Sequence, residues 1–206
     1  MPRTFRTLAL GLTLLTLPFT ALAQTAEAPA EAPAPTDLAM GAEVTPGLPN
    51  QAAAEVGQTY FAAAFDKWEQ RCEKTADGAD PCQLYQLLFD KDGNSVAEIS
   101  LFNLPEGGEA AAGATFVAPL ETLLTANLRI TVDAGSTRIY PFAFCAKQGC
   151  VARLGFTAEE LAALKAGLKA VVTIVPAAAP DQVVNLDLTL KGFTAGFDAV
   201  AAANAK

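Results

Sequence analysis

The sequence predicts a mainly β fold, an antiparallel β-sandwich or barrel-like domain of about eight or nine strands with one or two short helices. Two observations support this prediction. Short strand-like runs recur along the chain with turn residues between them, and their spacing is that of antiparallel hairpins. Helical patterns do not alternate with these runs, which argues against βαβ units.

The N-terminus is typical of a signal peptide. A short basic stretch precedes an apolar run over residues 8–19, and Ala21-Leu22-Ala23 forms an A-x-A site before Gln24. The run is shorter than the roughly 20 residues that span a bilayer. We therefore expect residues 1–23 to be removed by cleavage between Ala23 and Gln24. The product should have no transmembrane segment and should be periplasmic or secreted.

The chain is acidic. It contains 14 Lys and Arg against 22 Asp and Glu, and its formal net charge is −8. Loss of Arg3 and Arg6 with the signal peptide brings this to about −10. Binding to a phosphate backbone requires a concentrated positive surface, so nucleic acid is excluded as an expected partner.

Composition divides the exported chain into two parts. Residues 24–58 are dominated by Ala, Pro and Glu and contain no aromatic residue, which is typical of an extended, disordered linker. Residues 59–206 are long enough to bury a core and are expected to form one domain.

Within that domain, turn signals separate the predicted strands. Asp92-Gly93 is a strong hairpin signal because both residues tolerate positive φ, and residues 133–136 and 146–149 predict two further hairpins. The predicted strands are 67–73, 83–89, 96–102, 115–118, 128–132, 137–145, 150–156, 170–175 and 183–190.

One helix interrupts the strands. Thr157 and Glu160 form a capping box at its start, and Gly167 suits its C-terminal cap. Three leucines fall on one face and are expected to pack on the sheet: Leu161, Leu164 and Leu168. A second helix is predicted over 195–203.

Four cysteines form an even set, which in an exported protein predicts disulfides. Three pairings are possible. We predict Cys72 with Cys82 and Cys145 with Cys150, because each pair flanks a turn between predicted antiparallel strands. The spacing differs from the C-x-x-C of redox dithiols, and export disfavours a reduced zinc site.

The chain lacks histidine, which excludes histidine-based nucleophilic sites and histidine-ligated metals. No phosphate-binding glycine loop is present, and we expect no cofactor or metal. The acids Asp77, Asp80, Asp90 and Asp92 are candidates for a carboxylate hydrolase, but turn positions explain them better. The run from Asp90 to Asn94 lacks the glycine and glutamate positions of a calcium loop.

Two other residues are of types that recognise partners. Trp68 is the sole tryptophan, and Arg153 is a cation within an otherwise apolar strand. We expect Trp68 to anchor the core near Cys72. Arg153 is expected at a solvent-facing or edge position.

Four blocks of sequence carry a family resemblance. They are WEQRC at 68–72, PCQLYQ at 81–86, PFAFC and GCVAR within 141–153, and LKGFTAGF at 190–197. In this order they resemble the invasion-associated locus B family of alphaproteobacteria. The resemblance covers roughly residues 65–199 and implies an exported all-β domain. The family is named for a locus that promotes entry of a pathogen into host cells, and the resemblance implies no catalytic residue.

These observations predict an exported, non-enzymatic binding or envelope-associated protein whose partner is an unidentified protein or envelope component. Two alternatives remain. One is a carboxylate-based hydrolase of envelope glycans, and the other is a periplasmic envelope-stress or chaperone-like factor. No residue is assigned to catalysis, and the sequence identifies no binding residues.

Overall fold

The structure is a computed structural model of the chain and describes residues 47–205. These residues form two antiparallel sheets of seven and four strands, with two α-helices, and neither sheet closes into a barrel. The predicted mainly β fold is confirmed. In this part of the chain no helix is long and apolar enough to cross a membrane.

The large sheet combines strands that are distant in sequence. Its first five strands follow the chain as a meander, and the next neighbour of β5 is β9 rather than β6. In spatial order the strands are β1 (Thr59–Phe65), β2 (Trp68–Glu73), β3 (Cys82–Phe89), β4 (Ser95–Asn103), β5 (Ala112–Ala118), β9 (Gly149–Phe156) and β8 (Phe142–Ala146).

The small sheet is formed by two pairs of strands, which β8, β9 and the first α-helix separate in sequence. Its strands are β11 (Val184–Thr189), β10 (Lys169–Ile174), β6 (Leu128–Val132) and β7 (Thr137–Tyr140). A short 3₁₀ helix over Leu124–Ala126 precedes β6. The three predicted hairpin turns join β3 to β4, β6 to β7 and β8 to β9.

Helix α1 (Ala158–Ala166) begins with the predicted capping box. The Thr157 hydroxyl accepts a hydrogen bond from the Glu160 amide at 3.2 Å, and the Glu160 carboxylate accepts one from the Thr157 amide at 2.9 Å. The prediction of three packed leucines is wrong for Leu168, which is 81% exposed. The helix ends at Ala166, and the extended conformation of Gly167 carries Leu168 off the helical face.

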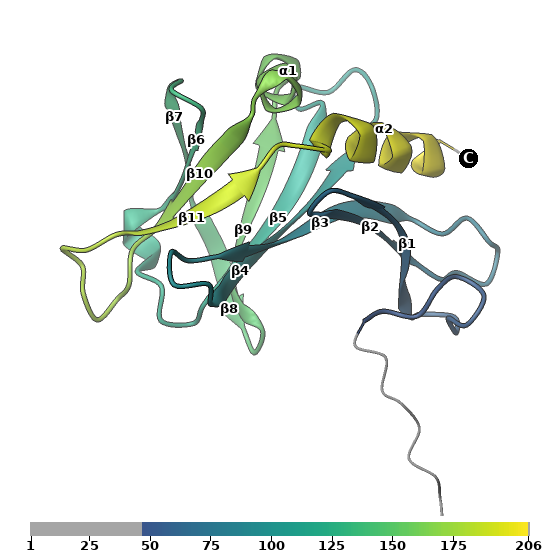
Figure 1. Cartoon of the computed structure of the whole chain (residues 1–206), viewed down its shortest axis with the longest axis horizontal. Coiled ribbons are helices and arrows are strands. Elements are labelled where there is room, and N and C mark those ends of the chain that lie inside the picture. Colours follow the sequence, from purple (N-terminus) through teal and green to yellow (C-terminus); the bar gives the residue numbers. More distant parts are fainter. Residues whose placement is uncertain (1–46, 206) are drawn as a thin grey trace, which may run out of the picture. The chain divides into compact units, whose positions relative to one another are not determined.

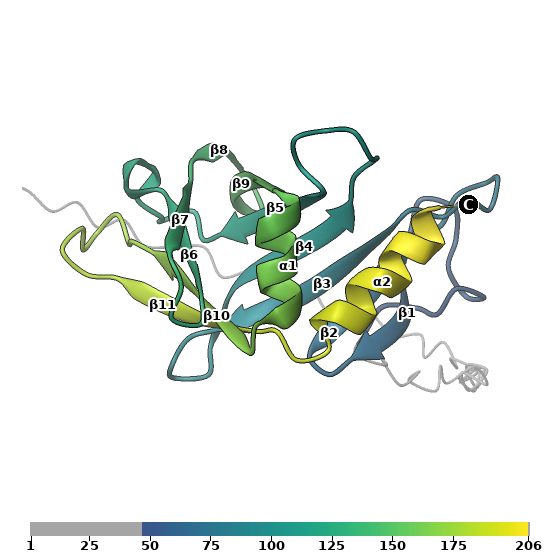
Figure 2. The same ribbon diagram turned by 90° about the horizontal axis from the view of Figure 1, so that it is seen from above.

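Both helices lie on the same side of the large sheet (Figures 1 and 2). Helix α2 (Phe193–Asn204) packs on β1 to β4. Strand β11 of the small sheet contacts β3, and α1 and β7 contact β9. Apolar side chains alternate along each strand so that one side of the large sheet faces this layer. We call this the inner face, and its opposite the outer face.

The structure differs from the predicted elements in three places. Strand β1 was not predicted, since only one of its residues, Tyr60, is buried. The predicted strand 137–145 is divided at Pro141 into β7 and β8, which belong to different sheets. Residues 47–58, assigned to the linker by sequence, bond to the edge of the domain, with the Phe61 amide donating to the Pro49 carbonyl.

The turn that leads into α2 requires glycine at position 192. Gly192 has φ +83°, and a Cβ there would overlap the carbonyl group of Phe65. Helix α2 also approaches the sheet closely at Gly196, where a Cβ would lie 2.6 Å from Leu84 Cδ1. The glycines of the LKGFTAGF block therefore set how α2 docks.

We expect Gly192→Ala to destabilise the fold by about 2 to 4 kcal/mol, through positive φ and overlap with backbone. Gly93→Ala is the matched control, since Gly93 has φ +84° with open space around it. Gly93→Ala should lose only the part of the unfolding free energy that comes from positive φ, about 1 to 2 kcal/mol. Denaturant unfolding of both variants measures the difference, and equal losses would contradict the docking role of Gly192.

Candidate functional site

The outer face is the side of the large sheet left uncovered by the helices and the small sheet. Figure 1 shows the sheet arching, with β1 at one margin and the β8–β9 hairpin at the other bending away from α2. Irregular register in β1, in β3 and in β8 accompanies this curvature. A hollow of about 450 Å³ on this face is lined by residues that include Leu87, Glu98 and Val117.

One end of the outer face carries an ordered cation–aromatic pair. The Arg71 guanidinium lies 3.2 Å from the centroid of the Tyr85 ring, and Glu69 holds it with contacts of 2.8 Å. The Tyr85 hydroxyl donates to Glu98 at 2.9 Å. Burial, and then the Glu98 carboxylate, raise the pKa of Tyr85 to about 12. These contacts fix the arginine plane before any ligand arrives.

The other end carries a second such pair. Arg153 lies on β9 with its guanidinium carbon 5.6 Å from the centroid of the Phe144 ring, and Phe144 is 45% exposed. Within the described residues Arg153 makes no ion pair. The sequence-based expectation of a solvent-facing Arg153 is therefore confirmed.

Small polar residues separate the two pairs. Tyr85 pairs with Ser100, Ser100 with Thr115, and Thr115 with Arg153, so the four residues form one row across four strands. At about 4.8 Å per strand, the two ends of the row are about 14 Å apart. The side chains in the middle of the row, Ser100 and Thr115, are short. An extended segment that crosses the strands can therefore contact the whole row.

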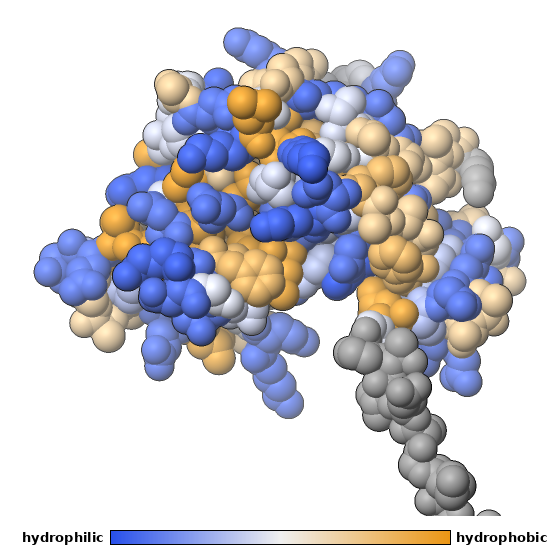
Figure 3. Space-filling model, viewed as in Figure 1, coloured by the Kyte–Doolittle hydropathy of each residue, from blue (hydrophilic) through white to orange (hydrophobic). Residues whose placement is uncertain are grey.

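Apolar side chains surround this row. Phe61, Leu87 and Phe89 lie on the same face and are 36%, 38% and 44% exposed. Exposed hydrophobic side chains are not confined to this face, since Ile139 and Leu168 are 60% and 81% exposed, and Figure 3 shows hydrophobic atoms among hydrophilic ones at the surface. What distinguishes the outer face is the combination of exposed apolar side chains with two arginine–aromatic pairs, of which the Arg71–Tyr85 pair is held in place by carboxylates.

A family model for the invasion associated locus B protein matches residues 68–201. The chain belongs to this family. Over 146 residues it is 29% identical to invasion protein B homologues of Brucella abortus strain 2308 and of biovar 1 strain 9-941, covering 71% of this chain and 82% of each relative. The crystal structure of invasion associated protein B from Bartonella henselae has a similar fold, with TM-score 0.58 and 20% identity, covering 70% of this chain and 98% of that one.

The blocks that indicated the invasion associated locus B family divide between the two faces. Trp68 and Leu84 point inward and are fully buried, and Trp68 has the predicted role of core anchor, with its ring edge-on to Phe193. Arg71 and Tyr85, from the same blocks, point outward. Sequence reasoning did not find these two, because their contact depends on the register of β2 with β3.

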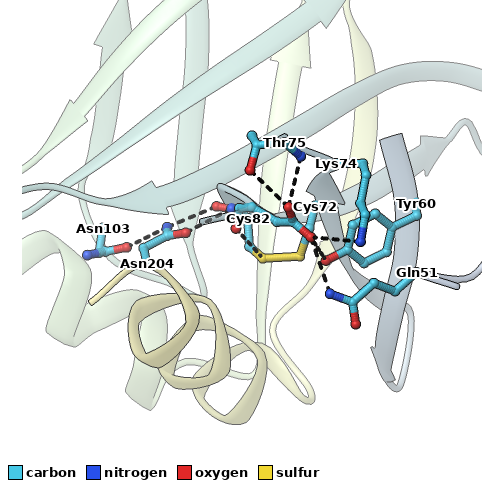
Figure 4. Close-up of a disulfide and its surroundings, with 9 residues drawn as sticks. Gln51, Tyr60, Cys72, Lys74, Thr75, Cys82, Asn103 and Asn204 are labelled. Atoms are coloured by element: carbon cyan, nitrogen blue, oxygen red, sulfur yellow. Dashed lines mark hydrogen bonds and ion pairs between the residues drawn. A yellow bond between two sulfur atoms is a disulfide. The ribbon is translucent and has the colours of Figure 1, made fainter. Parts of the chain in front are cut away.

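Both disulfides predicted for this family member are present. Cys72–Cys82 joins β2 to β3 at a directly paired position, and Cys145–Cys150 joins β8 to β9 in the same way. Figure 4 shows the first beside the end of α2, where Asn204 accepts from the Cys82 amide at 2.8 Å and donates to its carbonyl at 3.0 Å. The predicted cleavage site at Ala23 and Gln24 lies outside the described residues.

Asp80, a candidate hydrolase acid, is an organising group of the β2–β3 turn. Its carboxylate accepts hydrogen bonds from the Thr75 amide and hydroxyl, the Tyr60 hydroxyl and the Gln51 amide at 2.8 to 3.2 Å (Figure 4). Lys74 lies 3.9 Å away. The Thr75 amide, followed by the hydroxyl and Gln51 contacts, holds the pKa of Asp80 well below its usual range. The carboxylate is therefore ionised and its hydrogen-bonding capacity is used within the turn.

The other candidate acids also bond within turns. Asp77 accepts from the Ala79 amide, and Asp90 accepts from Asn94. The Thr75 side chain and then the Ala79 amide lower the pKa of Asp77, and Asn94 lowers the pKa of Asp90. Asp90 and Asp92 lie at the opposite end of β3 from Asp77 and Asp80, about 25 Å away at 3.3 Å per residue. A glycosidase needs one carboxyl of raised pKa near a second, and these four acids do not form that arrangement. Among residues 47–205 no cluster of acids or cysteines could hold a metal.

We expect all three tyrosines of this invasion associated locus B protein to ionise near pH 12. Burial is the main cause in each, and nearby carboxylates add to it: Asp80 for Tyr60, Glu98 for Tyr85 and Glu160 for Tyr140. Because the native pKa is raised, protonation of these tyrosines contributes to the free energy of unfolding. This contribution is complete below about pH 10 and is lost as pH rises toward 12.

Absorbance at 295 nm measures the titration, with the guanidinium-unfolded chain as the control that ionises near pH 10. A native tyrosine that also ionises near pH 10 would contradict the burial of its ring.

Proposed function

We propose that this invasion associated locus B protein is an exported, non-enzymatic binding module whose outer face docks a partner protein outside the cytoplasm. The observation that carries the proposal is the row between the Arg71–Tyr85 pair and the Arg153–Phe144 pair. Arginine and aromatic residues supply most of the binding energy in protein interfaces, especially when their side chains are held in place beforehand.

The chemistry of the outer face favours binding over reaction. The chain has no histidine, and its four cysteines are all in disulfides. The two glutamates at the Arg71–Tyr85 end are engaged by Arg71 and by the Tyr85 hydroxyl. What remains open to a ligand is the Arg153 side chain, the aromatic edges and the apolar side chains around the row.

Site-specific photocrosslinking in the native bacterium tests this proposal. A crosslinking amino acid at Leu87 or Phe144 should capture one partner of defined mass. The same group at Thr173 or Asn185, which pair on the exposed side of the small sheet, should capture none. The recovered chain is expected to begin at Gln24, as export with cleavage requires.

Arg153→Ala should reduce the Leu87 crosslink about tenfold while leaving the unfolding free energy unchanged, since this side chain is exposed. Capture from the small sheet alone would overturn the proposal. Many unrelated adducts from the outer face would also overturn it and favour the chaperone-like alternative. An intact Met1 in a cytoplasmic fraction would refute export.

A further inference from the structure

A groove separate from the outer face lies between the β6–β7 hairpin and α1. Its volume is about 330 Å³, at the lower end of the range for small-molecule sites. Buried side chains from three elements line it: Ile130 from β6, Phe156 from β9 and Leu164 from α1. An apolar lining reached from solvent favours a ligand with an apolar group.

An ion pair crosses the groove from the hairpin to the helix. Arg138 Nε on β7 donates to Glu160 Oε1 at 2.9 Å. The other Glu160 oxygen accepts from the Thr157 amide as part of the helix cap, so this carboxylate is held on both sides. The contact fixes the distance between the hairpin and the helix, so the groove is preformed.

A tyrosine hydroxyl in the groove is available to a ligand. The Tyr140 hydroxyl makes no hydrogen bond within the described residues, whereas the hydroxyls of Tyr60 and Tyr85 each donate to a carboxylate. The Tyr140 ring is held edge-on to Phe156, with 5.8 Å between centroids. Burial raises the pKa of Tyr140 to about 12, so its oxygen stays protonated and can both donate and accept.

The charged rim is predominantly acidic. Asp133, Glu159 and Glu160 line the groove with a single cation, Arg138, which Glu160 neutralises. Asp133 faces the backbone amides of Leu168 and Lys169, while Glu159 makes no ion pair among the described residues. The remaining negative charge favours a cationic ligand over an anionic one.

We propose that this groove is a binding site for a small amphiphilic cation, an alkyl or aryl group that carries an ammonium. The apolar group lies on Ile130, Phe156 and Leu164. The ammonium lies at the acidic rim, where Glu159 supplies the charge and the Tyr140 oxygen can accept a hydrogen bond. This site uses none of the residues of the outer-face row, so it is independent of the function proposed above.

Octylammonium is the probe, and titration of the full-length ¹⁵N-labelled chain followed by NMR is the measurement. We expect saturable shifts of the Tyr140 and Ala163 amides, with octanoate at least tenfold weaker. Absence of saturable shifts at the groove would overturn the proposal. Equal affinity for octanoate, or shifts that map instead to the outer face, would also overturn it.

Matched variants separate occupation of the groove from general hydrophobic binding. Ala163 is exposed and lines the groove, so Ala163→Leu should fill it and weaken octylammonium binding at least tenfold. Ala162→Leu adds the same side chain on the same helix away from the groove and should leave the affinity unchanged. Equal affinities of the two variants would contradict the site even if both fold normally.

Glu159→Gln tests the charge without filling the groove. This substitution should weaken octylammonium binding about two- to fivefold, the effect of one exposed charge. It should not weaken the binding of octanoate. Unchanged octylammonium affinity in Glu159→Gln would overturn the role of the acidic rim.

Discussion

The packing of this protein depends on a buried polar contact between its two sheets. Gln86 on β3 is 2% exposed, and its amide oxygen accepts from the Thr189 amide at 3.1 Å. The Thr189 carbonyl accepts from Gln86 Nε2 at 3.3 Å and from Trp68 Nε1 at 2.8 Å. These bonds join the large sheet to the last residue of β11. They fix where the chain leaves the small sheet and turns toward α2.

The consequences of this contact extend to both faces of the large sheet. Once Thr189 is held, the turn at Gly192 places Phe193 against Trp68, and α2 covers the first four strands. The inner face is then covered by α2, α1 and the small sheet. The row on the outer face is not covered by any further element of residues 47–205, and the register of β2 with β3 puts Arg71 over Tyr85.

Local features of this fold could be predicted from the sequence. The hairpin turns, the α1 cap and both disulfides depend on residues close in the chain, where turn chemistry and pairing across a turn decide the structure. Strand β1 was missed because four of its seven residues are exposed and three are alanine, which leaves little periodicity. The break at Pro141 was missed because apolar residues continue on both sides of it.

The candidate sites could not be predicted, because each is formed by strand pairings that local sequence does not specify. The row on the outer face needs β5 beside β9, which brings Thr115 next to Arg153 although β6, β7 and β8 intervene in sequence. The groove under α1 needs three strands and a helix. Sequence reasoning identified Arg153 as a type of residue that binds partners, and the structure supplied its surroundings.

The most direct test of this account is the unfolding free energy of Gln86→Leu, compared with Gln83→Leu on the same strand, whose side chain points to the outer face. Gln86→Leu should lose about 2 kcal/mol, because the Thr189 amide is left without its acceptor. Gln83→Leu should stay within about 0.5 kcal/mol of the parent chain. Equal stabilities of the two variants would contradict the claim that the Gln86–Thr189 contact holds the sheets together.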